Sequence, residues 1–524
     1  MKTDEKKGSH VSMWPSYFPR KKRERGLAFL SWSGAGSVDR GECRITHMNG
    51  AMDAIHSWEE LVSYQFHYST DLYIYKMVGK NGFPFFHEAV AQSLVIREGC
   101  TTPDVQIHIA NSSKTVTMIS VRGPKNKQVK IVSTSVWGFR REPTLAFLQA
   151  LWHIFEAFDY GVHPSPASLG QATIRHSMVE QAEMGGEKPR RFSRPSAMLR
   201  DRLLLYGSGG RADDFAEHTA EYPIVYETDF DNHYANQALM GVPVDGYETF
   251  GLLGCFTDNL EYLGEFALAY VECKVTIPEG LPRRKISPFY TRHDDHLLYW
   301  ETEPGAYYGW FFTPMIAQMV KVGYTVERGY GWGWRELSKF LVPFIEHAVA
   351  CRSACKARGM ELESDLIKGV IVGALGSFGT QPWRYVLVGK DEEQEGDEMF
   401  LDLEAKPCDG LSTPYYLRRV EEPDAPHLTQ ILYAVVMWAN VELYKLALLE
   451  EEQGNTVLMT NYDAVFTTDA PTVAQVKRKV KQLHNFRSLG KRSYTHSQGR
   501  ITPGVRHQHP DSPVSSSLPD SVPT

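Results

Sequence analysis

Alternating apolar and polar residues predict an α/β pattern in the first third of the chain. TVTMISVRG at 115–123 and QVKIVSTSVWG at 128–138 alternate on either side of a Gly-Pro-Lys-Asn-Lys turn, so we predict a β-hairpin. TLAFLQALWHIFEAFDYG at 144–161 instead has the spacing of an amphipathic helix. This mixture of strands and helices extends from about 27 to 190.

The most membrane-like window, LTQILYAVVMWANVELYKLALL at 428–449, is predicted to be a buried helix beneath a sheet. It contains Asn440, Glu442 and Lys445, which a membrane-spanning helix would rarely place in its centre. No signal peptide is expected, because the first apolar run follows a charged stretch and is too short. The sequence therefore predicts a protein without a membrane partner.

Two strand-like segments each end in a carboxylate. YETDFDNHYANQAL at 226–239 contains Asp229, and LMTNYDAVFTTD at 458–469 contains Asp463. Strand ends of this kind can hold two aspartates against one pair of metal ions, so these are the candidate catalytic and metal-binding residues. The competing interpretation of each is a solvated turn residue.

The chain of 524 residues has a net charge of −7, with 42% hydrophobic and 12% aromatic residues. Its length predicts three or four folding units, and its charge argues against indiscriminate nucleic-acid binding. Any DNA contact must come from local basic patches, at 20–25, 188–202 and 477–492. Near these patches, four aromatic residues are candidate stacking faces for single-stranded bases: Phe192, Tyr206, Phe486 and Tyr494.

The seven cysteines include no C-x-x-C pair, which indicates reduced thiols and a cytoplasmic setting.

The two aspartate segments resemble motifs of family B DNA polymerases. D-x-x-N-x-Y-A, from Asp229 to Tyr234, is similar to that family's D-x-x-S-L-Y-P, and Asp463 matches the second aspartate of its Y-x-D-T-D-S turn. Between them, KGVIVGALGSFG from Lys368 resembles the K-x-x-x-N-S-x-Y-G helix of the fingers. Upstream of it, Arg352 and Lys356 stand four residues apart and therefore share a helix face.

Two further segments resemble the protein-primed branch of that family. LLLYGSGGRADDF at 203–215 is similar to its Y-x-G-G-R linker, and GKRSYTH at 490–496 to the K-x-Y element that grips the primer terminus. The glycines of 207–210 do not fit a dinucleotide fingerprint. By resemblance, the candidate DNA-binding residues are Tyr206, Gly209, Gly210, Arg211, Lys491, Arg492 and Tyr494.

The resemblance implies an α/β and α+β multidomain fold. In it, an RNase H-like exonuclease-type domain precedes a polymerase domain with the right-hand arrangement of palm, fingers and thumb. The expected parts are a mobile basic N-terminus at 1–26, the exonuclease-like domain at 27–190, a linker at 191–220, palm and fingers at 221–475, a thumb and primer-grip region at 476–503 and a disordered tail at 504–524. Long spacings, 139 residues from Asp229 to Lys368 and 87 from Gly376 to Asp463, suggest insertions within about 280–330 and 385–425.

The expected exonuclease chemistry is missing from its domain. A 3′–5′ exonuclease needs a D-x-E pair and two further aspartates to hold its metals. Ser31, Trp32 and Ser33 stand where D-x-E is expected, and KNGFPFF at 80–86 has Asn81 without the following aspartate; Asp159 alone cannot hold two metals. We therefore expect a degenerate domain without proofreading, with misplacement of divergent motifs as the alternative.

The resemblance implies a template-directed DNA polymerase that uses two Mg²⁺, with Mn²⁺ as a substitute. Arg352, Lys356 and Lys368 would bind the triphosphate, and Tyr234 would select deoxyribose. Its partners would be DNA template-primer, deoxynucleoside triphosphates and a terminal priming protein of a viral or plasmid-like linear DNA. Several positions depart from the family pattern: Asn461 replaces the first aspartate of the turn, Val372, Gly373 and Leu375 replace the fingers Asn, Ser and Tyr, and Arg492 replaces the lysine of K-x-Y.

Asp231 could compensate for the acid missing at Asn461, whereas HDDH at 293–296 fits a polar surface turn better than a metal site. A second hypothesis, motivated by Asn461 and the missing exonuclease acids, is a catalytically impaired, polymerase-derived DNA-binding replication factor.

Overall fold

The described residues of this computed structural model cover most of the chain between 26 and 501. They are 26–32, 43–75, 77, 82–94, 103–110, 115–123, 127–139, 141–158, 162–186, 192–217, 220–282, 284–292, 298–380, 383–388, 399–400, 416–421, 428–471, 478–490, 493–496 and 499–501.

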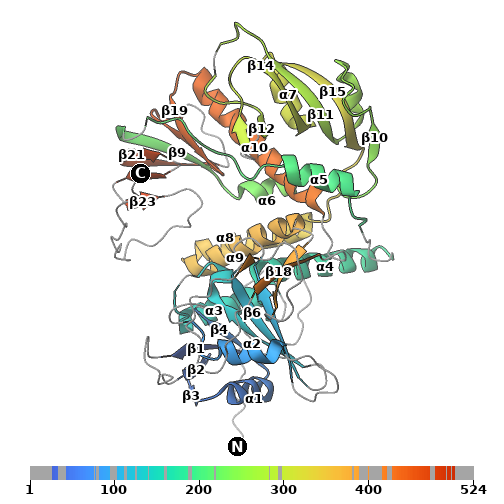
Figure 1. The fold of residues 1–524 in the computed structure, drawn as a ribbon. Coiled ribbons are helices and arrows are strands. Elements are labelled where there is room, and N and C mark those ends of the chain that lie inside the picture. The colour runs from blue at the N-terminus through green and yellow to red at the C-terminus, as the bar shows by residue number, and fades with distance from the viewer. Residues whose placement is uncertain are drawn as a thin grey trace, which may run out of the picture. The chain divides into compact units, whose positions relative to one another are not determined.

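The chain divides into two compact units, each made from two separate segments (Figure 1). Unit 1 comprises Met1–Pro195 and Lys339–Leu432, and unit 2 comprises Ser196–Ser338 and Tyr433–Thr524. The range predicted as palm and fingers, 221–475, is therefore shared between the units. Residues 339–432, which include the predicted fingers helices, belong with the N-terminal part of the chain.

Unit 1 contains a mixed seven-stranded sheet in the order β3-β2-β1-β4-β7-β6-β5. The central strands β1, β4 and β7 run parallel, and the outer strands pair antiparallel. The predicted hairpin at 115–138 is confirmed as β6 and β7. The strands are β1 Gly26–Trp32, β2 Cys43–His47, β3 Met52–Ile55, β4 Thr70–Ile74, β5 Asp104–Ile109, β6 Val116–Arg122 and β7 Gln128–Ser133.

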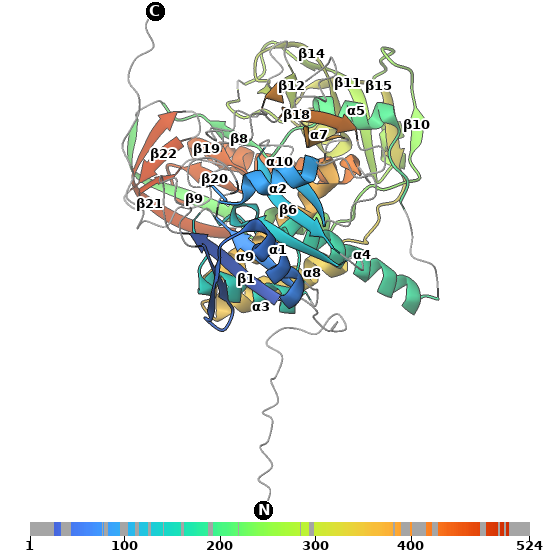
Figure 2. The ribbon, with the colours of Figure 1, turned by 60° about the horizontal axis from the view of Figure 1, so that its bottom comes forward.

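Helices cover both faces of this sheet, and its central strand β4 is therefore buried throughout. Leu72 and Ile74 pack into the core shared with α1 (Trp58–Tyr68) and α2 (Phe86–Leu94), which lie on one face (Figure 2). Tyr73 points the other way and meets Phe147 of α3 (Leu145–Ala157), with ring centroids 6.2 Å apart. The helix predicted at 144–161 is thus confirmed, and the alternation along β4 explains the two layers.

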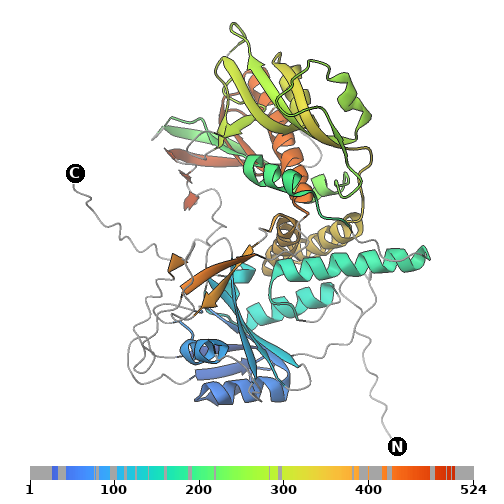
Figure 3. The same ribbon diagram turned by 45° about the vertical axis from the view of Figure 1, so that its right-hand side comes forward.

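Three further helices of unit 1 pack together (Figure 3). The helices are α4 (Pro166–Met184), α8 (Val342–Ala357) and α9 (Glu361–Gly376). A capping box between Ser165 and Ser168 starts α4. A Cβ on Gly170 of α4 would lie 2.4 Å from the Cβ of Ala374 on α9, so only glycine allows this close approach. Gln171 adds hydrogen bonds to the Ala374 carbonyl (3.1 Å) and the Ser377 hydroxyl (2.7 Å).

A small antiparallel sheet in unit 1 falls within the second predicted insertion, about 385–425. Its order is β16-β18-β17, and the Arg419 guanidinium lies 3.8 Å from the ring centroid of Trp383. The strands are β16 Trp383–Val388, β17 Met399–Phe400 and β18 Tyr416–Glu421.

Unit 2 contains an antiparallel seven-stranded sheet in the order β23-β22-β21-β9-β20-β19-β8. Val225, Phe466 and Phe486 belong to a core on one face, and Val457 and Val465 belong to a larger core that also contains α10. The strands are β8 Ala212–Asp214, β9 Glu221–Phe230, β19 Val457–Asn461, β20 Ala464–Thr467, β21 Arg478–Gly490, β22 Ser493–His496 and β23 Gly499–Ile501.

The predicted buried helix at 428–449 corresponds to α10, Thr429–Glu452. It is the helix among the described residues that is long and apolar enough to cross a membrane by length and composition, but 78% of its apolar window is buried inside the protein. Its apolar residues form much of the larger core of unit 2. This burial agrees with the prediction of a helix beneath a sheet.

A second, aromatic-rich sheet of unit 2 has the order β10-β15-β11-β14. Glycine alternates with aromatic residues in β15, and a Cβ on Gly331 or Gly333 would collide with the rings of Phe250 and Phe266 at 2.6 and 2.4 Å. The first predicted insertion, about 280–330, covers only part of this region. The elements are α5 Ala197–Tyr206, α6 His233–Ala238, β10 Glu248–Phe250, β11 Leu268–Ile277, β12 Tyr290–Arg292, β13 Leu298–Trp300, β14 Gly305–Phe312, α7 Thr313–Lys321 and β15 Thr325–Trp334.

Candidate active site

Asp229 and Asp463 occupy adjacent positions in the seven-stranded sheet of unit 2. Asp229 lies near the end of β9, in register with Ala464 of β20 and Lys479 of β21. The next residue, Phe230, donates its N–H to the Asp463 carbonyl at 2.7 Å. The structure therefore brings the backbones of two aspartates together that are separated by more than 230 residues in the sequence.

The turn that carries Asp463 is tight and is fixed by the linker. Asn461 and Ala464 pair across a two-residue connection, in which Tyr462 has a left-handed φ of 49°. A non-glycine residue rarely adopts this conformation without support from its surroundings. Here the Tyr462 N–H donates to the Arg211 carbonyl at 2.7 Å, so the linker holds the turn directly.

Tyr234 lies beside this turn on the short helix α6. Burial, together with the negative charges of Asp463 and ionised Tyr462, raises the pKa of its hydroxyl well above the usual value. The phenol therefore keeps its proton at neutral pH. The preceding residue, His233, stacks on Phe230 with ring centroids 4.4 Å apart and contacts the Ala439 carbonyl of α10 at 3.0 Å through Nε2. These contacts fix α6 between the strand and the long helix.

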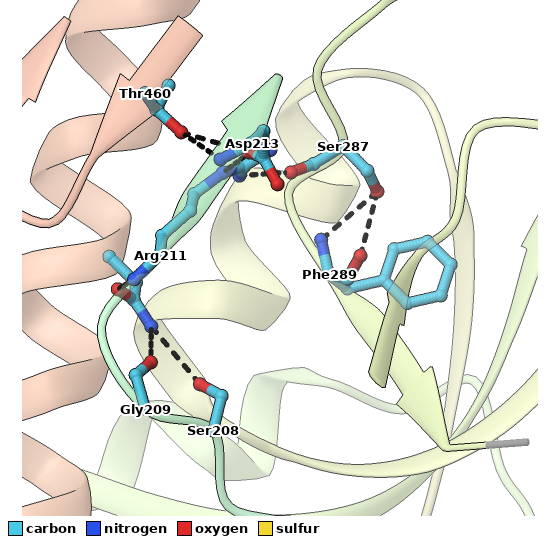
Figure 4. A network of polar contacts seen from close by, with 8 residues as sticks. Ser208, Gly209, Arg211, Asp213, Ser287, Phe289 and Thr460 are labelled. Carbon is cyan, nitrogen blue, oxygen red and sulfur yellow. Dashed lines mark hydrogen bonds and ion pairs between the residues drawn. The ribbon is translucent and has the colours of Figure 1, made fainter. Parts of the chain in front are cut away.

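The linker residues Ser208, Gly209 and Arg211 lie next to these residues in unit 2 (Figure 4) and are held by Asn440 of α10. Asn440 is 3% exposed. Its Oδ1 accepts the Arg211 N–H at 2.7 Å, while its Nδ2 donates to the Ser208 hydroxyl and the Gly209 carbonyl, both at 3.1 Å. One side chain thus satisfies three polar groups of the buried linker.

Arg211 was predicted to bind DNA, but the structure buries its side chain completely. Its guanidinium bonds to Asp213 through Nε, donates to the Ser287 carbonyl at 2.6 Å through Nη1 and lies 3.9 Å from the ring centroid of Trp300. Asp213 in turn accepts from the Thr460 hydroxyl at 3.2 Å (Figure 4). A guanidinium enclosed in this way acts inside the fold and is not presented to a DNA phosphate.

Tyr494 was also predicted to contact DNA and is likewise buried, at 2% exposure. Its ring stacks on Phe486 with centroids 4.9 Å apart and lies 5.3 Å from that of Phe466. Burial and the charges of Glu227 and Asp463 raise the pKa of its hydroxyl. Neither Tyr494 nor Phe486 therefore offers a stacking face for bases; both support the sheet that carries the aspartates. Lys491 and Arg492 lie outside the described residues.

The remaining linker candidates occupy different surroundings. Tyr206 ends α5 and packs partly buried against the larger core of unit 2. Gly209 is exposed, and an added Cβ there would meet no atom within 4 Å. Gly210, by contrast, lies against Tyr234 and Tyr462.

The three candidate cations belong to unit 1, on the helices α8 and α9. These helices are joined by three residues and pack side by side. Lys356 and Lys368 are exposed, and Arg352 is partly exposed. The solvent-exposed side of α9 also carries Val372 and Gly376, whereas Leu375 is buried and Gly373 packs against Ala167 of α4. Cys351 and Cys355 of α8 are buried and therefore have a packing role.

The carboxylate pair lacks a third metal-binding side chain within the described part of the chain. No group of three or more His, Cys, Asp or Glu residues there is arranged to hold a metal ion. Asn461, at the place of the missing aspartate, has a buried Oδ1 without a hydrogen-bond partner among the described residues. Asp231 follows β9 and is partly buried. Mg²⁺ commonly binds one or two carboxylates together with substrate phosphates, so two aspartates remain a suitable donor set.

The exonuclease-like domain shows strand β1 where it was predicted, with Ser31 and Trp32 at its end. Asp71 on the neighbouring strand β4 is 1% exposed, and its Oδ1 accepts the Lys130 N–H at 2.8 Å. Ser33, Asn81 and Asp159 lie outside the described residues. Asp71 is in register with Leu27 near the start of β1, away from Ser31 and Trp32.

Comparison with known proteins supports the polymerase-like fold. The chain matches a structure of Phi29 DNA polymerase complexed with primer-template DNA and incoming nucleotide substrates, with a TM-score of 0.63 and 12% identity over 90% of this chain and 88% of that chain. A Phi29 DNA polymerase complexed with primer-template DNA in the post-translocation state gives a TM-score of 0.61 and 12% identity, over 90% and 87%. No protein-family model and no curated protein matches. The likeness establishes a shared mixed α/β fold and supports the expected family B polymerase fold.

Sequence reasoning missed Asn440, Asp213 and Thr460 as residues that support the site. Asn440 was noticed only because it interrupts an apolar helix. A single amide inside such a helix is a usable signal, because a buried amide needs hydrogen-bond partners.

We predict that Asn440→Leu destabilises the protein. The substitution leaves the buried Arg211 N–H without its partner, which should cost about 1–3 kcal/mol. Thermal denaturation should show a lowered midpoint. Lys445→Leu, on an exposed position of the same helix, is the matched control and should change the midpoint little. Equal midpoints for Asn440→Leu and the parent would show that the clamp contributes nothing to stability.

Proposed function

We propose that this chain is a template-directed DNA polymerase that adds deoxynucleotides to a primer 3′-hydroxyl. One observation carries the proposal: Asp229 near the end of β9 lies next to the β19–β20 turn that carries Asp463, in a chain whose fold matches Phi29 DNA polymerase over 90% of its length. The fold alone does not specify chemistry. The two aspartates would supply the carboxylates that the proposed chemistry requires.

In the proposed reaction, the primer 3′-oxygen attacks the α-phosphorus of a deoxynucleoside triphosphate. A bond forms between these atoms, the bond from the α-phosphorus to the bridging oxygen breaks, pyrophosphate leaves and the hydroxyl proton passes to solvent or a nearby base. Such transfers depend mainly on positioning and charge stabilisation. Asp229 and Asp463 would hold two Mg²⁺ or Mn²⁺ ions, which when bound lower the hydroxyl pKa and stabilise the leaving group.

Arg352, Lys356 and Lys368 would bind the β- and γ-phosphates. Arginine can contact phosphate oxygens bidentately, and the lysines act as point charges. Lys356 and Lys368 are exposed on the α8–α9 hairpin, and Arg352 is partly exposed. Tyr234 would lie under the incoming sugar, where its ring leaves no room for a 2′-hydroxyl. Its buried, protonated phenol favours a fixed orientation.

We further propose that priming uses a terminal protein and that the chain replicates a viral or plasmid-like linear DNA in the cytoplasm. The sequence resemblance of the linker and the insertions supports this proposal. Primer-template DNA and deoxynucleotides would be its other partners. A catalytically impaired replication factor, suggested by Asn461, is less favoured, because a pure binding protein has no reason to retain both aspartates, Tyr234 and the three cations.

Extension should depend on both aspartates. Asp229→Asn or Asp463→Asn keeps the side-chain size and removes its charge, so primer extension with Mg²⁺ should fall about 100-fold or more. DNA affinity, measured by fluorescence anisotropy, should change little. Asp469→Asn alters an exposed acid just after β20 and serves as the control. Full extension by either site variant would refute the metal assignment.

Nucleotide use should depend on Lys368. Removing its charge in Lys368→Ala should raise the deoxynucleotide KM or lower kcat by about tenfold, because one phosphate contact is lost. Steady-state extension at varied nucleotide concentration measures both constants. Glu361→Ala, an exposed change at the start of α9, is the matched control. If only template affinity changes, this helix does not bind the triphosphate.

We propose that the chain lacks proofreading, because Ser31 and Trp32 offer no carboxylate where the exonuclease needs one. Hydroxyl and carbonyl groups alone bind Mg²⁺ too weakly to assemble a two-metal site. A 3′-labelled single-stranded oligonucleotide should therefore stay intact in the presence of Mg²⁺. Label release that disappears in Asp39→Ala or Asp159→Ala would identify a working nuclease instead.

A further inference from the structure

The linker glycine Gly210 is in close contact with two tyrosines of the candidate active site. A Cβ built on Gly210 would lie 2.1 Å from the Tyr234 hydroxyl oxygen and 2.5 Å from Cδ1 of Tyr462. A carbon atom does not approach a non-bonded heavy atom this closely without a steric collision. Gly210 does not have a positive φ. The requirement for glycine at this position therefore comes from space and not from backbone conformation.

The linker cannot easily retreat from these rings, because it is held on both sides of Gly210. The Gly209 carbonyl accepts from Asn440, and the Arg211 N–H donates to the same residue. The Arg211 carbonyl accepts the Tyr462 N–H at 2.7 Å. An added methyl group at 210 must therefore displace a tyrosine, and the end of the Tyr234 side chain has the closest atom.

Tyr234 has limited freedom on its other side as well. Its neighbour His233 is 3% exposed and contacts both Phe230 and the Ala439 carbonyl. Because the helix backbone is fixed in this way, the ring orientation depends on what faces the hydroxyl. Gly210 provides that surface.

We infer that Gly210 is a positioning residue that seats the Tyr234 ring and thereby sets sugar selection. This inference rests on the proposed polymerase function and extends it to a residue that does not touch the nucleotide. It also assigns different roles to the two adjacent linker glycines. Gly210 acts through Tyr234, whereas Gly209 is exposed and meets no atom that an added methyl group would displace.

The test compares incorporation of deoxynucleotides and ribonucleotides by four variants on one primer-template. Gly210→Ala should lower the ratio of kcat/KM for dNTP to that for rNTP by about tenfold, the effect expected of one misplaced methyl-sized contact. Gly209→Ala is the matched control and should keep the parental ratio. Tyr234→Phe removes the oxygen nearest to the new methyl group but keeps the ring. The double variant Gly210→Ala/Tyr234→Phe should therefore recover most of the parental ratio.

Thermal denaturation of the same proteins provides a readout that does not require catalysis. Gly210→Ala should lower the midpoint, and Tyr234→Phe should offset part of that loss, so the two changes are non-additive. An additional double variant, Gly209→Ala/Tyr234→Phe, should show no such coupling. This comparison also covers the case in which Gly210→Ala folds poorly, because the double variant removes the closer of the two collisions, the one with the Tyr234 hydroxyl oxygen.

The outcomes separate this inference from the proposed function. A parental ratio in Gly210→Ala, or additive denaturation midpoints, would overturn the inference while leaving polymerase activity in place. An equal loss of selectivity in Gly209→Ala would also overturn it, because a general linker effect would then explain the result. If the parent extends no primer, the proposed function fails, and the role in sugar selection fails with it.

Discussion

The buried linker backbone is the constraint on which the candidate site depends. Polar backbone groups inside a protein must find hydrogen-bond partners, and Asn440 supplies them for residues on both sides of Gly210. With the linker held there, the Arg211 carbonyl can fix the turn that carries Asp463. The ion pair of Arg211 with Asp213 and the stacking of its guanidinium on Trp300 compensate the burial of charge. The site is thus built from contacts among α10, the linker and the sheet.

Local pattern was sufficient to predict the hairpin β6–β7, helix α3 and the burial of α10, because periodicity reports which side of an element is buried. The two aspartates were predicted as strand-end residues, and the structure places Asp229 near the end of β9 and Asp463 in the adjoining turn between β19 and β20. Arg211 and Tyr494 were misjudged because a cation or an aromatic residue near a basic patch looks the same in sequence whether it faces solvent or the core. Their surroundings come from residues far away in the chain, such as Trp300 and Phe466.

The carboxylate pair also has consequences for its own electrostatics. In the proposed metal site, Asn461 contributes no negative charge, so two carboxylates would attract divalent cations less strongly than three. The neighbouring phenols of Tyr234 and Tyr494 stay protonated and add no charge. The affinity proposed for metal would therefore rely more on oxygens that a substrate brings. A site of this kind is expected to assemble fully only when nucleotide is bound.

The seam between α4 and α9 makes one mechanical unit of helices that lie about 200 residues apart in the sequence. Gly170 and Ala374 are in contact with no room for a further methyl group, and Gln171 bonds the last turn of α9. Sliding or tilting α9 alone would break these contacts and open a gap that no side chain can fill. Any displacement of α9 must therefore carry α4 with it, so the two helices behave as one rigid element inside unit 1.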